Sequence, residues 1–132
     1  MDIVIDTSAI LAVLVAEPER DAIVAATTGH ALIGPGSIPW EVGNAFTAMI
    51  KQRRIEVAEA QRGLEIFRSV PIRYVEVDLA NVVSIAAEAN IYAYDAYFLE
   101  CATRCGAPLL TLDLSLRRVA NRIGLGLIHL EV

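Results

Sequence analysis

The sequence has no long hydrophobic run, although 55% of its 132 residues are hydrophobic. No stretch approaches the ~20 consecutive apolar residues of a transmembrane helix. No basic segment precedes the first apolar run, which Asp2 and Asp6 flank. The sequence therefore predicts neither a membrane span nor a signal peptide. We expect a cytoplasmic protein with a large core and an apolar surface that a partner covers.

Cysteine and histidine are scarce, with two residues of each. Cys101 and Cys105 lie four residues apart on a predicted helix, where a disulfide would constrain almost nothing. No second pair of Cys or His stands at the spacing of a zinc site. His30 and His129 are isolated and have no Ser or Cys motif beside them. We expect small buried thiols, and we assign the two histidines no chemistry.

Positive charge is also limited, because 11 Lys and Arg face 16 Asp and Glu, for a net charge of −5. An acidic balance argues against a nucleic-acid partner, since phosphate contacts need basic residues. Setting aside four acids as candidate metal ligands leaves 12 acids against 11 bases, which is nearly neutral. The bases cluster at 51–54 and 117–122, where solvated helix ends are the simpler interpretation.

The order of apolar runs predicts strands alternating with helices. Short apolar runs predict strands at 3–5, 31–34, 74–77, 109–112 and 127–130. Helical spacing predicts helices at 9–16, 19–28, 79–89, 94–105 and 114–123, and a helical hairpin over 38–69. This alternation is typical of right-handed βαβ units. We therefore predict one domain over 1–132, a three-layer α/β/α sandwich with a mainly parallel central sheet.

The predicted hairpin carries more apolar side chains than one sheet face can cover. We expect its helices to contribute to a dimer or partner interface, with Phe46 either in that interface or in the core. The apolar positions at helical spacing are Ile38, Val42, Phe46, Met49, Leu64 and Phe67.

Two acids follow predicted strands directly. Asp6 ends the run 3–5, and Asp113 ends the run 109–112. If these strands are neighbours in a parallel sheet, both carboxylates leave the same edge, where open α/β sheets bind ligands. Thr111 lies two residues before Asp113, so it points to the same face and could hydrogen-bond a carboxylate. Thr7 and Ser8 could cap a helix that starts at Ala9.

Two further acids lie in the first turns of predicted helices, where the helix dipole alone would favour them. Asp95 stands in the apolar run 92–99, and Glu41 follows residues 38–40. Acids inside such runs are rarely left unpaired. Asn44, three residues after Glu41, shares its helix face and could orient it.

No basic residue is near enough in sequence to pair all four acids. Crowded carboxylates are stable only when protonated or bound to a cation. An all-oxygen ligand set favours Mg²⁺ or Mn²⁺ over zinc. Such an ion lowers the pKa of bound water and neutralises charge on a phosphate. The pattern therefore indicates metal-dependent phosphodiester hydrolysis without a covalent nucleophile.

Four segments, in order, resemble the successive motifs of PIN-domain nucleases, most closely the VapC-type toxin ribonucleases of toxin–antitoxin pairs. They are IVIDTSA at 3–9, PWEVGNA at 39–45, YDAYFL at 94–99 and LTLD at 110–113. The resemblance implies an acidic quartet around Mg²⁺ or Mn²⁺, with support from other side chains. It also implies single-stranded or structured RNA as the substrate, a homodimer and an antitoxin that wraps the hairpin. The implied quartet is Asp6, Glu41, Asp95 and Asp113, supported by Thr7 or Ser8 and by Thr111.

Two other classes remain as alternatives. A phosphoryl-transfer domain also uses an Asp after its first strand. The phosphatase pattern needs a second Asp where Ser8 stands, and the receiver pattern needs a Lys after a late strand, whereas the only lysine is Lys51. The second alternative is a non-catalytic binding module in which all four acids are helix caps. Such caps would bind no divalent ion tightly.

Overall fold

The computed structural model describes residues 1–131 and contains a four-stranded, all-parallel sheet with strand order β3-β2-β1-β4. The strands are β1 (Asp2–Ile5), β2 (Ala31–Pro35), β3 (Ile72–Val75) and β4 (Leu109–Leu110). β1 lies inside the sheet, and its residues Ile3, Val4 and Ile5 are buried. The β-branched run at the start of the sequence therefore forms a central parallel strand, as predicted.

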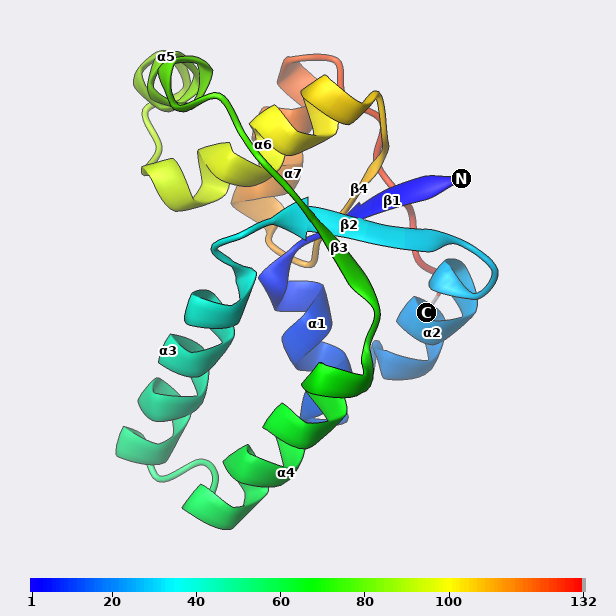
Figure 1. The fold of residues 1–132 in the computed structure, drawn as a ribbon, viewed down its shortest axis with the longest axis vertical. Coiled ribbons are helices and arrows are strands. Elements are labelled where there is room, and N and C mark those ends of the chain that lie inside the picture. The colour runs from blue at the N-terminus through cyan, green and yellow to red at the C-terminus, as the bar shows by residue number, and fades with distance from the viewer. Residues whose placement is uncertain (132) are drawn as a thin grey trace.

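Seven helices cover the two faces of this sheet within the described residues. They are α1 (Thr7–Leu14), α2 (Arg20–Thr27), α3 (Ile38–Lys51), α4 (Val57–Ser69), α5 (Leu79–Ala89), α6 (Ala93–Cys105) and α7 (Leu114–Arg122). In Figure 1, α5, α6 and α7 lie above the sheet and α1 to α4 below it. The predicted three-layer α/β/α sandwich is confirmed.

The carboxyl-terminal part of the sheet differs from the prediction. The run 127–130 forms no strand, only a single parallel bridge between Leu127 and Leu109. β4 also ends at Leu110, because the N–H groups of Leu112 and Asp113 donate to side-chain hydroxyls and not to the sheet ladder. Because β4 has only two residues, the run 127–130 cannot extend its pairing into a fifth strand.

The third strand lies earlier than the predicted run 74–77. Pairing with β2 sets its position, because Ile72 stands opposite Leu32 and Val75 opposite Pro35. β3 is an edge strand with an exposed Tyr74. An edge strand with exposed positions needs no continuous apolar run, so the apolar run 74–77 did not predict where β3 begins and ends.

Phe46 is a core residue of this chain, so the interface interpretation of Phe46 is wrong. It lies buried on α3, together with Ile38 and Val42. A Cβ added at Gly63 on α4 would lie 2.7 Å from Phe46 Cζ, so the absence of a side chain lets the two helices approach. Figure 1 shows this hairpin extending away from the sheet.

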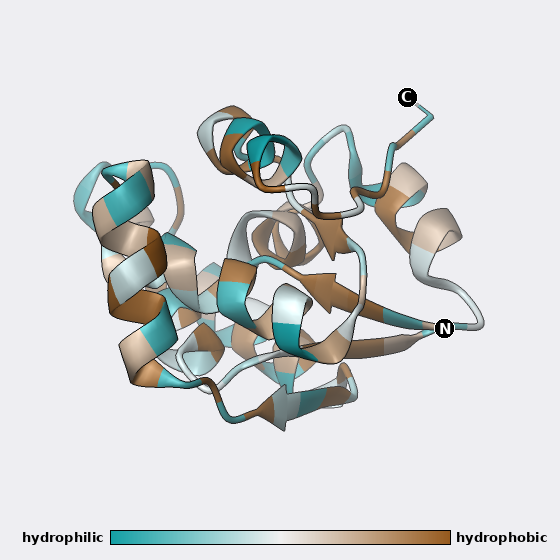
Figure 2. Cartoon of the chain, turned by 90° about the horizontal axis from the view of Figure 1, so that it is seen from above, coloured by the Kyte–Doolittle hydropathy of each residue, from teal (hydrophilic) through white to brown (hydrophobic). Residues whose placement is uncertain are grey.

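Hydropathy follows the layers. Figure 2 shows largely hydrophobic strands, whereas the helices mix hydrophobic and hydrophilic residues along their length. Within residues 1–131, no helix combines the length and the apolar character needed to cross a membrane.

Candidate active site

All four predicted acids line one cleft of about 510 Å³ at the carboxyl edge of the sheet. They come from four separate segments: the end of β1, the first turns of α3 and α6, and the residue before α7. Thr7, Ser8 and Asn44 line the same cleft. The acids are Asp6, Glu41, Asp95 and Asp113.

Pairing of β1 with β4 brings the first and last acids together. Val4 stands opposite Leu109 and Ile5 opposite Leu110, and the Asp6 N–H donates to the Leu110 carbonyl at 2.9 Å. The two strands end side by side, so Asp6 and Asp113 emerge at the same edge, as predicted from the parallel arrangement.

Two hydroxyl groups hold one oxygen of the buried Asp6 carboxylate. Ser8 Oγ donates to Oδ2 at 2.7 Å, and Thr111 Oγ1 donates to the same atom at 2.6 Å. Each hydroxyl also accepts a backbone N–H, Ser8 from Leu112 and Thr111 from Asp113, both at 3.0 Å. The predicted Thr111 hydrogen bond to a carboxylate is confirmed, and the network ties the end of β1 to the end of β4.

The predicted capping by Thr7 and Ser8 is wrong. Helix α1 begins at Thr7, with Asp6 in the N-cap position and no side-chain capping hydrogen bond. Both hydroxyls turn instead to the acids of the cleft, because Ser8 binds Asp6 and Thr7 Oγ1 donates to Glu41 Oε1 at 3.3 Å.

Glu41 is held by Ser37, a residue that the sequence analysis did not single out. Ser37 Oγ donates to Glu41 Oε2 at 2.6 Å, one helical turn away, and makes no capping hydrogen bond. The i, i+4 spacing of Ser37 and Glu41 is a signal that could have revealed this pair. Asn44 lines the cleft but makes no hydrogen bond to Glu41 among the described residues, so its orienting role stays a prediction.

Asp113 does two things at once. Its Oδ1 accepts the N–H groups of Ser115 and Leu116, at 2.8 Å and 3.1 Å, so it caps α7 as predicted. Both capping bonds use the same oxygen. Capping therefore leaves the second carboxylate oxygen for other interactions in the cleft.

Burial and mutual repulsion favour the neutral forms of three of these acids. Burial is the largest cause that raises the pKa of Asp6, opposed by the hydrogen bonds from Thr111 and Ser8. Burial likewise raises the pKa of Glu41, and the charges of Asp6 and Asp95 add to it. The pKa of Asp95 is raised by burial and by the charges of Asp113 and Asp6. The four carboxylates therefore act on one another electrostatically.

The cleft suits a divalent cation by the chemistry of its donors. Its polar lining consists of carboxylate, hydroxyl and amide groups, and none of the described residues that line it is basic. Oxygen donors are the ligands that Mg²⁺ and Mn²⁺ prefer. As the side chains stand in residues 1–131, no group of three or more His, Cys, Asp or Glu is close enough to hold one ion. A shared metal therefore requires the carboxylates to move inward.

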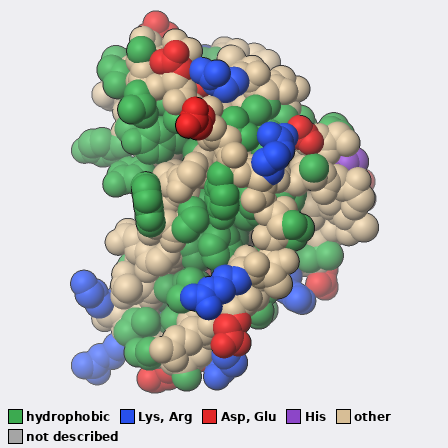
Figure 3. All heavy atoms as spheres, in the orientation of Figure 1, with side chains coloured by type: hydrophobic (Ala, Val, Ile, Leu, Met, Phe, Trp, Pro, Cys, Tyr) green, Lys and Arg blue, Asp and Glu red, His purple; other side chains and the backbone are tan. Residues whose placement is uncertain are grey.

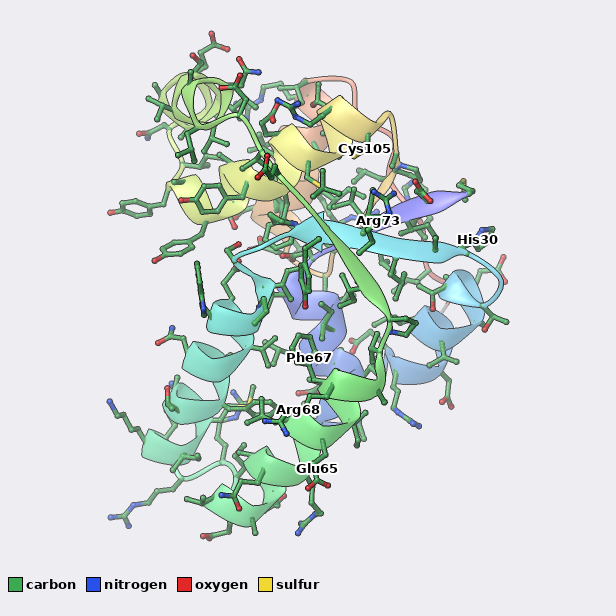
Figure 4. All side chains as sticks on the ribbon, viewed as in Figure 1. His30, Glu65, Phe67, Arg68, Arg73 and Cys105 are labelled. Atoms are coloured by element: carbon green, nitrogen blue, oxygen red, sulfur yellow. The ribbon has the colours of Figure 1, made fainter. Side chains whose placement is uncertain are left out.

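The remaining nucleophilic and imidazole groups lie away from the cleft. In Figure 4, His30 is at the start of β2 and Cys105 at the end of α6, far from the starts of α3 and α6. Cys101 and Cys105 are unpaired, and burial raises the pKa of Cys101 to about 12. The expectation of buried thiols is confirmed for Cys101, whereas Cys105 is half-buried.

A parallel sheet with acids at its carboxyl edge, contributed by segments from β1 to β4, defines a class of α/β protein. A family model identifies that class. The chain belongs to the PIN domain family, whose model matches residues 3–122. Within that family it is similar to VapC ribonuclease Mb0985 of Mycobacterium bovis and ribonuclease VapC9 of Mycobacterium tuberculosis. Each is 30% identical over 115 residues, which is 86% of this chain and 87% of the relative. The resemblance to VapC-type PIN domains is confirmed.

Solved structures share the fold. PAE2754 from Pyrobaculum aerophilum matches with a TM-score of 0.70 and 25% identity, over 90% of this chain and 87% of that one. VapBC2 from Rickettsia felis, bound to a DNA fragment from its promoter, matches with a TM-score of 0.68 and 15% identity, over 99% and 100%. FitAcB from Neisseria gonorrhoeae matches with a TM-score of 0.54 and 16% identity, over 96% of both chains.

Proposed function

We propose that residues 1–132 form one nuclease domain, a divalent-metal-dependent endoribonuclease that is the toxin of a type II toxin–antitoxin pair. The observation that carries this proposal is the gathering of four carboxylates in one cleft whose described lining contains no basic group. The names of the VapC relatives support RNA as the substrate. We also propose that the protein acts in the cytoplasm, where RNA is available as a substrate.

Asp6, Glu41, Asp95 and Asp113 would hold Mg²⁺ or Mn²⁺, and the ion would supply an activated water and neutralise charge on the scissile phosphate. The protein's own contribution is to fix the ligands. Ser8 and Thr111 orient Asp6 through Oδ2, and Ser37 orients Glu41 through Oε2. Such outer hydrogen bonds set ligand geometry and basicity.

Asp95 has a different place in this scheme. It accepts no side-chain hydrogen bond among the described residues that would fix it, and it is half-buried. Its position at the start of α6 nevertheless couples it electrostatically to Asp113 and Asp6. Asp95 is therefore the acid best able to move toward a cation shared with the other three.

Metal-dependent cleavage is tested directly with purified protein and total RNA. We expect cleavage with Mg²⁺ or Mn²⁺, a 5′-phosphate on the product and no cleavage in EDTA. Asp95→Asn should lower the rate by roughly a hundredfold or more, because a lost ligand removes several kcal/mol of transition-state stabilisation. Glu65→Gln, on the exposed side of α4, is the matched control and should keep full activity. Cleavage that survives EDTA would contradict the mechanism.

We propose a homodimer and a cognate antitoxin as partners. Exposed apolar side chains on the outer layer support this proposal. Leu79 and Val83, four residues apart on α5, are both exposed, and Figure 3 shows hydrophobic side chains gathered where α5 and the start of α6 lie. Patches of this kind mark interaction sites.

A further inference from the structure

Large aromatic side chains stand exposed at the rim of the acidic cleft. Trp40 and Tyr94 line the cleft, yet 80% of Trp40 and 63% of Tyr94 is accessible to solvent. Tyr92, two residues earlier, is 87% exposed. Folding normally buries rings of this size, because each removes a large apolar area from water. Leaving such rings in water forgoes the free energy that their burial would supply. Two exposed rings at one cleft therefore indicate that a ligand covers them.

Each lining ring is the immediate neighbour of an acid. Trp40 precedes Glu41 in the first turn of α3, and Tyr94 precedes Asp95 in the first turn of α6. Tyr94 is also braced, because its ring packs edge-on against Tyr97 with centroids 6.1 Å apart and planes at 89°. The two rings therefore stand on separate helices, and each of these helices also contributes an acid to the cleft.

Basic side chains do not explain how a polyanion would stay at this cleft. No Lys or Arg is among the described residues that line it. Lys51 ends α3, 13 residues beyond the first, about 20 Å along the helix axis. Nucleobases, by contrast, stack on aromatic rings independently of charge, and every base offers a π face.

We propose that Trp40 and Tyr94 position the RNA by stacking on unpaired nucleobases on either side of the scissile phosphate. This proposal rests on the nuclease function proposed above. Paired bases within a duplex are already stacked and cannot present their faces to a side chain. The rings therefore select unpaired regions while the acids act on the phosphate between them.

Trp40 is the only tryptophan, so its fluorescence reports directly on its own stacking. The probe is a short RNA without self-complementarity, compared with the same RNA annealed to its complement. The protein is Asp95→Asn with Mg²⁺ present, so that binding is observed without cleavage. We expect quenching by the single strand and none by the duplex. Equal quenching by both, or anisotropy-detected binding without quenching, would overturn the proposal.

Ring substitutions test the stacking independently. Trp40→Ala and Tyr94→Ala should weaken binding of the single strand fivefold to roughly a hundredfold, as loss of one base stack does. Trp40→Phe and Tyr94→Phe should retain most of the affinity because a ring remains. Tyr74→Ala is the control, since Tyr74 is 45% exposed on β3 and does not line the cleft.

Three outcomes separate this proposal from its competitors. RNA cleavage with wild-type KM in both alanine variants would overturn the stacking while leaving the nuclease function intact. Absence of any RNA binding or cleavage by the wild type would overturn both. Loss of the dimer or of antitoxin binding in Trp40→Ala, with RNA affinity unchanged, would show that the rings form a protein interface. Circular dichroism of every variant identifies any that fail to fold.

Discussion

At the scale of single residues, Asp6 is the most constrained acid of the cleft. It is buried, and two hydroxyls from segments 103 residues apart converge on one of its oxygens. The Ser8 and Thr111 hydroxyl oxygens also lie 3.2 Å apart, within hydrogen-bond distance of each other. The carboxylate therefore holds these two side chains together as much as they hold it.

Thr111→Val should uncouple this network while keeping the shape of the side chain. The change removes a donor from Asp6 and an acceptor from the Asp113 N–H, so we expect a loss of about 1–3 kcal/mol of stability. Metal-dependent cleavage should fall roughly 10- to 100-fold, because Asp6 loses its orientation. Thermal melts and RNA cleavage rates measure both effects. Thr47→Val on exposed α3 is the control, and an equal loss there would contradict the prediction.

Asp95→Asn should raise the melting temperature of the protein at neutral pH when divalent metal is removed. The folded-state pKa of Asp95 is raised, so the folded state binds more protons than the unfolded state above the ordinary pKa of 3.8. Stability therefore falls as pH rises through the folded pKa. Removing this charge removes that loss, and the variant should also gain less stability from added Mg²⁺ or Mn²⁺.

The control for Asp95 is an acid that only starts a helix. Asp21 lies in the first turn of α2 and is exposed. Asp21→Asn should lower the melting temperature slightly, by losing a favourable interaction with the helix dipole, and should leave the metal response unchanged. A lower melting temperature for metal-free Asp95→Asn would reduce Asp95 to the same helix-start role.

At the scale of elements, the α3–α4 hairpin depends on a glycine contact. Gly63→Ala should destabilise the protein by about 1–2 kcal/mol, because the added Cβ would lie 2.7 Å from the buried ring of Phe46. Gly43→Ala, in the interior of α3 with no neighbouring atom within 4 Å, should instead stabilise by about 0.5–1 kcal/mol through helix propensity. Chemical denaturation of both variants gives the two signs. Equal changes in the free energy of unfolding for the two variants would contradict the close contact between Gly63 and Phe46.

Most helices and strands could be predicted because the pattern of residues within each segment determines its secondary structure. Helical spacing of apolar residues located α5 at Leu79–Ala89, with bounds identical to those of the structure. The run 127–130 could not be placed, because β4 stops when side-chain hydroxyls take its next N–H groups. Strand length at this edge depends on a tertiary hydrogen-bond network that no local pattern encodes.

The candidate site, like the fold, could be predicted only in part. Acids after strands and at helix starts identified the four carboxylates, because parallel topology brings these positions to one edge. The groups that orient them were harder to predict. The spacing suggested Asn44 as a partner of Glu41, whereas the structure gives the Glu41 hydrogen bonds to Ser37 and Thr7. Hydroxyl orientation follows from packing, which spacing alone does not determine.

At the scale of the whole molecule, the exposed apolar face of α5 should set the oligomeric state. We expect the wild type to be a dimer by light scattering. Val83→Glu should yield a folded monomer, because it places a charge in the apolar patch with Leu79. Val57→Glu, at an exposed valine of α4, is the control and should remain dimeric. A monomeric wild type would contradict the dimer, and a dimeric Val83→Glu would place its interface elsewhere.

The acids are spread over nearly the whole length of the chain, which has a consequence for synthesis on the ribosome. Thr111 and Asp113 are made more than a hundred residues after Asp6. A chain interrupted before β4 lacks Asp113, one of the two hydroxyl donors to Asp6, and the strand that pairs with β1 on that side. The nascent polypeptide would therefore carry an incomplete cleft until residues 109–113 have been made. A cell would be spared the activity of unfinished copies.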